Sequence, residues 1–227
     1  MKSGKKFNEG KSKVDKTKLY ELSDAVSMMK ELKYAKFDES IDMAIKLVHK
    51  SFQNIRGSAV LPAGTGKEKK VLVICKGDKQ KEAQDAGADH VGAEEIIEKI
   101  QGGWIDFDAV VATPDMMKLV GKLGQVLGRK GLMPKPKAGT VTEDVKGIIK
   151  ELKGGRVEYK ADKSGVVHMN VGKLSFEESA IMDNVQAFYN QVFKDKPSEA
   201  KGNYIKSVHI SSTMGPGIKI NYKGIEK

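Results

Sequence analysis

Cysteine and long apolar runs are what this sequence most clearly lacks. Its 227 residues include a single cysteine, Cys75, inside the apolar run VLVIC, so no internal disulfide can form and we expect the thiol to pack in a core. No apolar span is long enough to cross a bilayer, and the lysine-rich start MKSGKKFNEGKSK is not followed by the apolar stretch of a signal peptide. These absences exclude a disulfide scaffold and predict a soluble protein of a reducing cytoplasm, with no membrane partner.

Catalytic and cofactor motifs are missing as well. AGTGK at 63–67 resembles a phosphate loop, but Leu61 stands where that motif needs glycine, and Glu68 where it needs serine or threonine. The glycines within 121–128 end a helix instead of opening one after a strand, so they form no dinucleotide fingerprint. The four histidines have no metal-ligand spacing among themselves: His49, His90, His168 and His209. We therefore expect no metal, no cofactor and no enzymatic activity.

Positive charge is what the chain has in excess. Forty Lys and Arg residues stand against thirty Asp and Glu residues, which gives a formal net charge of +10 and a pI near 9.4. This balance favours an anionic partner such as nucleic acid. With 39% hydrophobic residues, a chain of this length can bury one or two cores, so we expect compact domains and not a disordered tail.

The first 67 residues contain too few predicted elements to close a core alone. After a basic start that we expect to be frayed, residues 23–35 have the apolar spacing of a helix. Residues 39–47, ESIDMAIKL, alternate between apolar and polar side chains as in a half-buried strand. A second strand is predicted at 57–62, where Pro62 ends it.

From Val71 onward, short apolar strands alternate with helices. The pattern predicts strands at 71–76, 90–92 and 108–113, and helices at 78–88, 94–101, 114–127 and 142–152. Thr113 and Pro114 match a cap and a first-turn proline for the helix that begins there. Because such alternation is typical of a parallel sheet covered by helices, residues 68–157 are predicted to form a Rossmann-like three-layer α/β domain.

An antiparallel pattern returns after Arg156. We expect residues 156–162 and 165–173 to pair as a hairpin turned at 163–165. A long amphipathic helix is predicted next, with Ser175 and Glu178 at the spacing of a capping box.

Near the C-terminus the sequence is SSTMGPG at 211–217, between two segments in which apolar and polar residues alternate as in strands. Glycine and proline here predict a hairpin turn. Since neither end of the chain closes a core alone, we expect 1–67 and 158–227 to form one split two-layer α+β domain. The fold class is therefore α+β and α/β, with the three-layer domain at 68–157 inserted into the split domain.

One loop, residues 128–142, is unusually basic. No acidic residue occurs from Met116 through Thr142, while cations accumulate and Pro134 and Pro136 stiffen the chain around them. Contact with phosphates and a solvated loop that braces an interdomain cleft are equally compatible with this charge. The basic residues that would make secondary RNA or cleft contacts are Arg129, Lys130, Lys135 and Lys137.

Several motifs, in this order, resemble the ribosomal protein L1 family of the large subunit: GSAVLPAGTGK, FDAVVATPDMM, VGKLGQVLGRKGLMPKPKAGTVT, VEYKADKSGVVHMNVGKLSF and SSTMGPG. The similarity covers nearly the whole chain. It implies the split two-domain fold, a free monomer, and binding to the stalk region of large-subunit rRNA beside the exit site for deacylated tRNA. It also implies that the protein assists release of that tRNA and represses translation by binding its own operon mRNA. Arg129 and Lys135 depart from the family pattern, which usually has proline and asparagine there, and Ser40 replaces a threonine.

The resemblance also implies the RNA-binding residues: Lys36, Phe37, Ser40, Asp42, Lys163, His168, Gly172, Lys173, Ser175, Ser211, Thr213, Met214 and Gly215. Small hydroxyls and glycine backbone suit close approach to ribose 2′-hydroxyls and phosphates, whereas lysine alone binds without discrimination. Asp42 fits as an acceptor for a 2′-hydroxyl, with an exposed strand carboxylate as the alternative. Phe37 is expected to support the site by packing and not by stacking on a base.

Two other classes of protein are the alternatives. An enzyme acting on a phosphorylated small molecule would use the α/β domain, but it needs a catalytic group that the sequence does not offer. A protein of the membrane surface would use the basic N-terminus, but the predicted helices lack the strongly basic amphipathic face that such binding requires.

Overall fold

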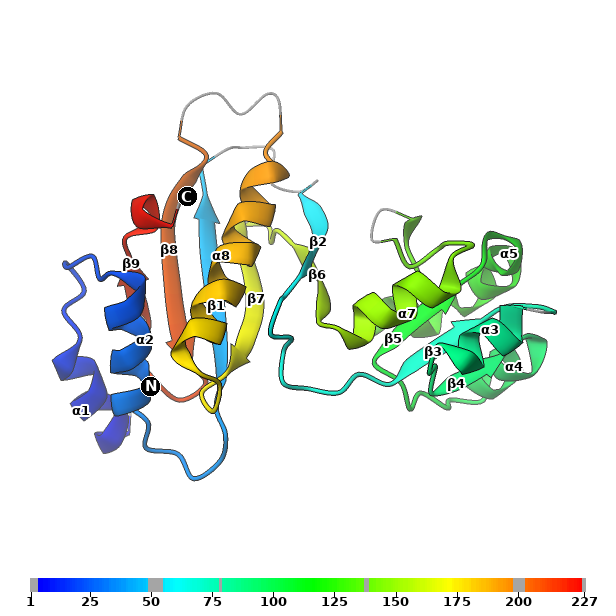
Figure 1. Ribbon diagram of the computed structural model, residues 1–227, viewed down its shortest axis with the longest axis horizontal. Helices are drawn as coiled ribbons and strands as arrows, with labels where there is room; N and C mark the ends of the chain where they lie inside the picture. Colours follow the sequence, from blue (N-terminus) through cyan, green and yellow to red (C-terminus); the bar gives the residue numbers. More distant parts are fainter. Residues whose placement is uncertain (1–3, 49–54, 78, 137–138, 198–202, 226–227) are drawn as a thin grey trace. The chain divides into compact units, whose positions relative to one another are not determined.

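The computed structural model describes residues 4–48, 55–77, 79–136, 139–197 and 203–225. The chain divides into two compact units, each described here by itself (Figure 1). The split unit comprises Met1–Gly66 and Val157–Lys227, and the inserted unit comprises Lys67–Arg156. These boundaries differ by one residue from those expected from the sequence.

The split unit is built on a four-stranded antiparallel sheet in the order β7-β1-β8-β9. Its strands are β1 (Ser40–Leu47), β7 (Val166–Lys173), β8 (Ile205–Ser212) and β9 (Ile218–Ile220). The alternation expected in β1 is present, because Ile41, Met43 and Ile45 are fully buried while Asp42 is exposed. Figure 1 shows α2 (Leu22–Glu31) and α8 (Glu178–Lys194) lying over one face of this sheet, where the buried side chains form a single core.

A second, two-stranded sheet extends the same core. It pairs β2 (Arg56–Val60) with β6 (Arg156–Lys160), and Tyr159 of β6 meets Phe188 of α8 edge to face at 5.5 Å between ring centroids. The expected turn at 163–165 is present, since the Gly165 amide donates to the Asp162 carbonyl at 3.1 Å, but the expected pairing of 156–162 with 165–173 is limited to the residues next to that turn. There an isolated bridge joins Ala161 to Val167, and the Asp162 amide donates to the Val166 carbonyl at 2.9 Å. The rest of each strand pairs with the first part of the chain, β6 with β2 and β7 with β1.

Two further expectations for the split unit are wrong. Within the basic start, Lys5–Lys13 are not frayed and form helix α1. The capping box at Ser175 and Glu178 does not form: α8 has Glu177 at its N-cap position and no side-chain cap. The Ser175 hydroxyl instead donates to Asp38 Oδ2 at 2.8 Å, which ties the start of this helix segment to the loop before β1.

The inserted unit has the predicted parallel sheet, in the order β4-β3-β5. Its strands are β3 (Val71–Ile74), β4 (His90–Gly92) and β5 (Ala109–Ala112). In the central strand, Leu72 and Ile74 pack in a cluster with α4 (Glu94–Gln101), whereas Val71 and Val73 pack in another with α3 (Lys79–Asp85) and α7 (Val145–Lys153). Two clusters on opposite faces of the sheet make three layers, and Cys75 is buried in the second cluster as expected.

The single helix predicted at 114–127 is broken into short pieces. The chain runs through η2 (Pro114–Met116), α5 (Met117–Val120), η3 (Gly121–Leu123) and α6 (Gly124–Arg129). Glycine is a poor helix former, and Gly121 and Gly124 open the last two pieces. Pro114 does occupy the first turn, but the Thr113 side chain makes no capping bond. A true cap occurs at α7, where Asp144 Oδ1 accepts a hydrogen bond from the Gly147 amide at 3.0 Å.

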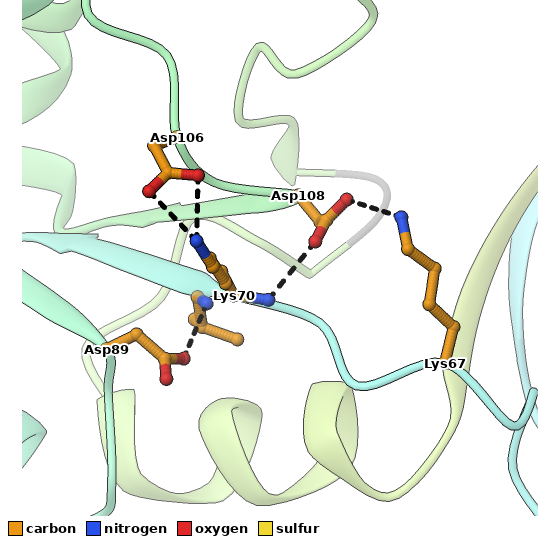
Figure 2. Close-up of polar contacts among 6 residues, drawn as sticks. Lys67, Lys70, Asp89, Asp106 and Asp108 are labelled. Atoms are coloured by element: carbon orange, nitrogen blue, oxygen red, sulfur yellow. Dashed lines mark hydrogen bonds and ion pairs between the residues drawn. The ribbon is translucent and has the colours of Figure 1, made fainter.

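Carboxylates and lysines fix the start of β3 (Figure 2). Lys70 Nζ donates to both carboxylate oxygens of Asp106 at 2.8 and 2.9 Å, and the Lys70 amide donates to Asp108. Lys67 Nζ also donates to Asp108, and the Val71 amide donates to Asp89 at 2.9 Å. The bond from Lys67 lowers the pKa of Asp108, and the bond from the Val71 amide lowers the pKa of Asp89. Both groups are therefore anionic structural anchors at neutral pH, and neither is poised as a general acid.

Candidate nucleic-acid interface

Three segments that are far apart in the sequence meet at one end of the four-stranded sheet. The loop at 34–40 leads into β1, the segment 173–175 follows β7, and the β8–β9 turn, residues 213–217, follows β8. The strand register brings their ends together, because Ser40 pairs with Lys173 and Ile41 pairs with Ser212. Most of the residues implied as RNA-binding therefore lie in one neighbourhood.

Hydrogen bonds clasp the β8–β9 turn to the loop before β1. The Ser40 amide donates to Thr213 Oγ1 at 3.0 Å, and the Thr213 amide donates to the Ser40 carbonyl at 3.0 Å. The Met214 amide donates to Glu39 Oε2 at 3.0 Å, and the Tyr34 hydroxyl donates to the Met214 carbonyl at 2.9 Å. The hydroxyl and amides of the turn thus hold it in place, and the Met214 side chain projects with 44% of its surface exposed.

Gly215 and Gly172 have roles within the protein itself. A Cβ on Gly215 would lie 2.5 Å from Ser212 Oγ, and the Gly215 amide donates to the Ser212 carbonyl. Gly172 is buried with φ +149°, opposite a register shift between Ile41 and Asp42. A Cβ there would lie 3.1 Å from the Phe176 ring. Both glycines shape the backbone at this end of the sheet.

Lys173 and Ser175 are bound to the loop before β1. Lys173 Nζ donates to Ser40 Oγ at 2.8 Å, and the Ser175 amide donates to Asp38 Oδ1 at 3.1 Å. Lys36 and Phe37, just before Asp38, are exposed. The expectation that Phe37 packs is wrong, because 52% of its side chain is open to solvent. Phe37 and Met214 therefore give this surface two exposed apolar groups.

Asp42, His168 and Ser211 lie on the sheet face that is turned away from α2 and α8. In the register, Asp42 pairs with both Asn170 and Ser211, and Asn170 Nδ2 donates to Asp42 Oδ1 at 3.2 Å. His168, two residues before Asn170 in β7, is exposed, and its Nε2 lies 3.9 Å from a carboxylate oxygen of Asp162. These side chains form a polar row that continues from the clasped turn onto the open face of the sheet.

Lys163 is not part of this neighbourhood. It lies in the turn before β7, while Lys173 ends that eight-residue strand, so the strand's full length separates the two lysines. At the Lys163 end, Lys46 pairs with Val166 and its Nζ bonds to the Ser164 carbonyl. The antiparallel register places Lys163 at the opposite end of the sheet from the β8–β9 turn, and its contact with RNA stays a prediction.

The basic loop at 128–142 belongs to the inserted unit. Arg129 and Lys130 are exposed at the end of α6, and the Lys135 amide donates to Thr140 Oγ1 at 2.8 Å. Lys137 lies outside the described residues. Thr140 is buried, so the loop has a fixed inner side and presents its first two cations outward.

Sequence reasoning missed Glu39, Tyr34 and Asp38. Glu39 is 1% exposed, and its Oε1 has no hydrogen-bond partner among the described residues. The alternating pattern of 39–47 gives no sign that its first residue would turn inward to hold the Met214 amide. The sequence pointed to the hydroxyls and glycines of the turn as contacts for RNA, but no sequence pattern predicted the residues of the protein that bind them.

Within the described ranges, no cluster of three or more His, Cys, Asp or Glu side chains could hold a metal ion. The same ranges contain no helix that is long and apolar enough to cross a bilayer.

Comparison with known proteins gives one consistent family. Residues 29–216 match the sequence model of the ribosomal protein L1p/L10e family. A protein of Leptospira biflexa called large ribosomal subunit protein uL1 is 59% identical over 223 residues, covering 98% of this chain and 97% of the relative. The protein of that name from Treponema denticola is 56% identical, covering 98% of this chain and 99% of the relative. The matched region includes both candidate RNA surfaces, the clasped turn up to Pro216 and the basic loop.

Proposed function

Because the chain belongs to the ribosomal protein L1p/L10e family, we propose that it is a non-enzymatic constituent of the large ribosomal subunit in the cytoplasm. It binds the stalk region of large-subunit rRNA and assists release of deacylated tRNA from the exit site. The RNA-binding surface is the end of the split unit where loop 34–40, segment 173–175 and the β8–β9 turn meet. The observation that carries this proposal is the clasp of Thr213 and Met214 to Ser40 and Glu39.

The chemistry of this surface suits RNA. The side chains that project from this surface, Phe37 and Met214, are apolar, and Lys36 beside Phe37 is an exposed cation. Sequence-specific RNA recognition takes unstacked bases, whose faces pack on aromatic and apolar side chains. Lys36 contributes the sequence-independent attraction to phosphates, in a chain of net charge +10. The apolar side chains of Phe37 and Met214, beside hydrogen-bonded backbone, therefore recognise the shape of the RNA, and the cations add affinity.

The same surface is proposed to bind the operon mRNA of the protein. One clasped turn cannot hold two RNAs at once, so rRNA and mRNA compete, and translation is repressed only when the protein exceeds its rRNA. An enzyme acting on phosphorylated small molecules is not favoured, because Asp106 and Asp108 in the described part of the inserted unit form ion pairs with Lys70 and Lys67.

Exchange of the projecting side chains tests the proposed surface. The wild-type chain, Phe37→Ala and Met214→Ala are each titrated with a stalk rRNA fragment and with an unrelated hairpin of equal length. We expect each variant to lose about tenfold in affinity for the stalk fragment, since base contacts are worth about 1–3 kcal/mol, and to bind the hairpin as the wild type does. Phe193→Ala is the matched control, because Phe193 is 43% exposed on α8, outside the three segments. Equal affinity of the wild type for both RNAs would refute the proposal.

A further inference from the structure

Helix α1 packs beside the β8–β9 turn. Gly10, in the middle of this helix, is buried, and a Cβ added to it would lie 3.8 Å from Pro216 Cδ and 3.9 Å from Leu32 Cδ2. The backbone of α1 is therefore close to the turn and to the end of α2. A segment expected to be a frayed basic tail is instead held in a defined place next to the candidate RNA surface.

A hollow of about 220 Å³ opens between α1 and the turn. It is lined by Phe7, Lys11, Val14, Lys16, Pro216 and Gly217. Val14 and Pro216 are buried and Phe7 is half-buried, so the inner walls are apolar, whereas Lys11 and Lys16 are exposed. The hollow is smaller than the ~300–1,000 Å³ typical of pockets for drug-sized ligands.

We propose that this hollow holds one unstacked nucleotide of the bound RNA, with its base against Phe7 and Pro216 and its phosphate beside Lys11 and Lys16. The inference rests on the proposed function, because it needs an RNA already bound at the β8–β9 turn, whose Pro216 and Gly217 line the hollow. An aromatic ring beside apolar walls suits the face of a base, and two lysines beside it suit the attached phosphate. Helix α1 thereby adds a specific contact to the surface and not merely diffuse positive charge.

Another side of α1 provides an internal comparison. A second hollow there, of about 460 Å³, is lined by Lys6, Glu9, Gly10, Ser12, Lys13, Glu31, Leu32, Lys33 and Tyr34. Its two glutamates offset its lysines, so it attracts phosphate less than the first hollow does. Lys6 and Lys13 are therefore matched controls for Lys11 and Lys16: they carry the same charge on or next to the same helix but line the second hollow.

The experiment uses the full chain and a stalk rRNA fragment in which 2-aminopurine replaces one unpaired base at a time. With the wild type, we expect binding to change the fluorescence strongly at one position, where the base meets Phe7. Phe7→Ala and Phe7→Leu remove that change and lower the affinity about tenfold, because the stacking partner is lost. The pair Lys11→Ala and Lys16→Ala lowers affinity for the stalk fragment about tenfold, while the pair Lys6→Ala and Lys13→Ala lowers it about twofold and leaves the fluorescence change intact.

The possible outcomes separate this inference from the proposed function. If the wild type selects the stalk fragment but Phe7→Leu and the Lys11 and Lys16 pair bind it within twofold of wild type, the nucleotide hollow is refuted and the turn surface stands. If circular dichroism shows that Phe7→Ala loses helix, Phe7→Leu and the lysine pairs decide. If the wild type does not select the stalk fragment at all, the proposed function itself fails and this inference fails with it.

Discussion

Replacing Thr213 by valine should weaken both folding and RNA binding, although the residue is exposed. The Thr213 hydroxyl accepts from the Ser40 amide at 3.0 Å and donates to the Ser40 carbonyl at 3.2 Å, and valine keeps the shape while removing both bonds. Each intramolecular hydrogen bond contributes about 0.5–1.5 kcal/mol, and water can reach this site, so we expect a loss of about 1–2 kcal/mol in the free energy of unfolding. For a chain of this size the melting temperature would fall by about 2–8 °C.

Urea unfolding and filter binding measure the two effects in parallel. Specific RNA affinity should fall about 3–10-fold, because a loosened turn holds Met214 in its binding position for a smaller fraction of the time. Thr213→Ser is the matched control, since it retains the hydroxyl and loses only a methyl group. If Thr213→Val unfolds at the same urea concentration as Thr213→Ser, the hydroxyl does not clasp the turn. If Thr213→Val is destabilised but binds the stalk fragment normally, the clasp has no role in recognition.

Three more predictions test the division of labour within the chain. Raising salt should weaken binding to the unrelated hairpin more steeply than binding to the stalk fragment, because counterion release scales with the phosphates neutralised; equal slopes in a salt titration would contradict the importance of base contacts. Replacing residues 67–156 with a short flexible linker should leave a folded product that still selects the stalk fragment, since all three segments of the surface remain; a folded product without selectivity would assign recognition to the loop at 128–142. The inserted unit should lose stability as pH falls below about 4, because the pKa values of Asp89 and Asp108 are lowered in the folded state. The stabilisation from these two groups is fully present above the unfolded pKa of about 3.9 and is lost as the folded carboxylates become protonated. Asp108→Asn should make the unit's stability less dependent on pH in a circular dichroism titration at acid pH.

Local patterns predicted the elements whose burial is periodic. The alternation of Ile41, Met43 and Ile45 and the continuous apolar run of β3 each reflect a burial pattern that the side chains themselves determine, so those strands appear where expected. Pairing between strands is not local. β6 and β7 are adjacent in sequence and their residues predict a hairpin, yet β6 pairs with β2 and β7 pairs with β1, both from the first 60 residues. No pattern within 156–173 predicts these two pairings.

The candidate site was predictable as a set of segments and not as a set of contacts. The resemblance named Thr213, Met214 and Ser40 together, and the structure places them side by side. It could not show that the Thr213 hydroxyl and the Gly215 backbone serve the turn itself, because their partners, the Ser40 backbone and Ser212 Oγ, become neighbours only through the tertiary fold. Helix α1 was missed for a similar reason: Phe7 is the only large apolar residue of its sequence, KKFNEGKSK, and its neighbours Leu32 and Pro216 are brought to it only by the tertiary fold.

The most direct test of the account is to map the RNA contact by nuclear magnetic resonance, adding a stalk rRNA fragment to the ¹⁵N-labelled full chain and following every backbone amide. The account predicts that the largest shifts fall on residues 36–42, 173–175 and 211–217, and that an unrelated hairpin of equal length leaves these amides nearly unchanged. Shifts concentrated instead at 128–136, or spread evenly over exposed lysines with both RNAs, would contradict the claim that the clasped end of the split unit recognises the RNA.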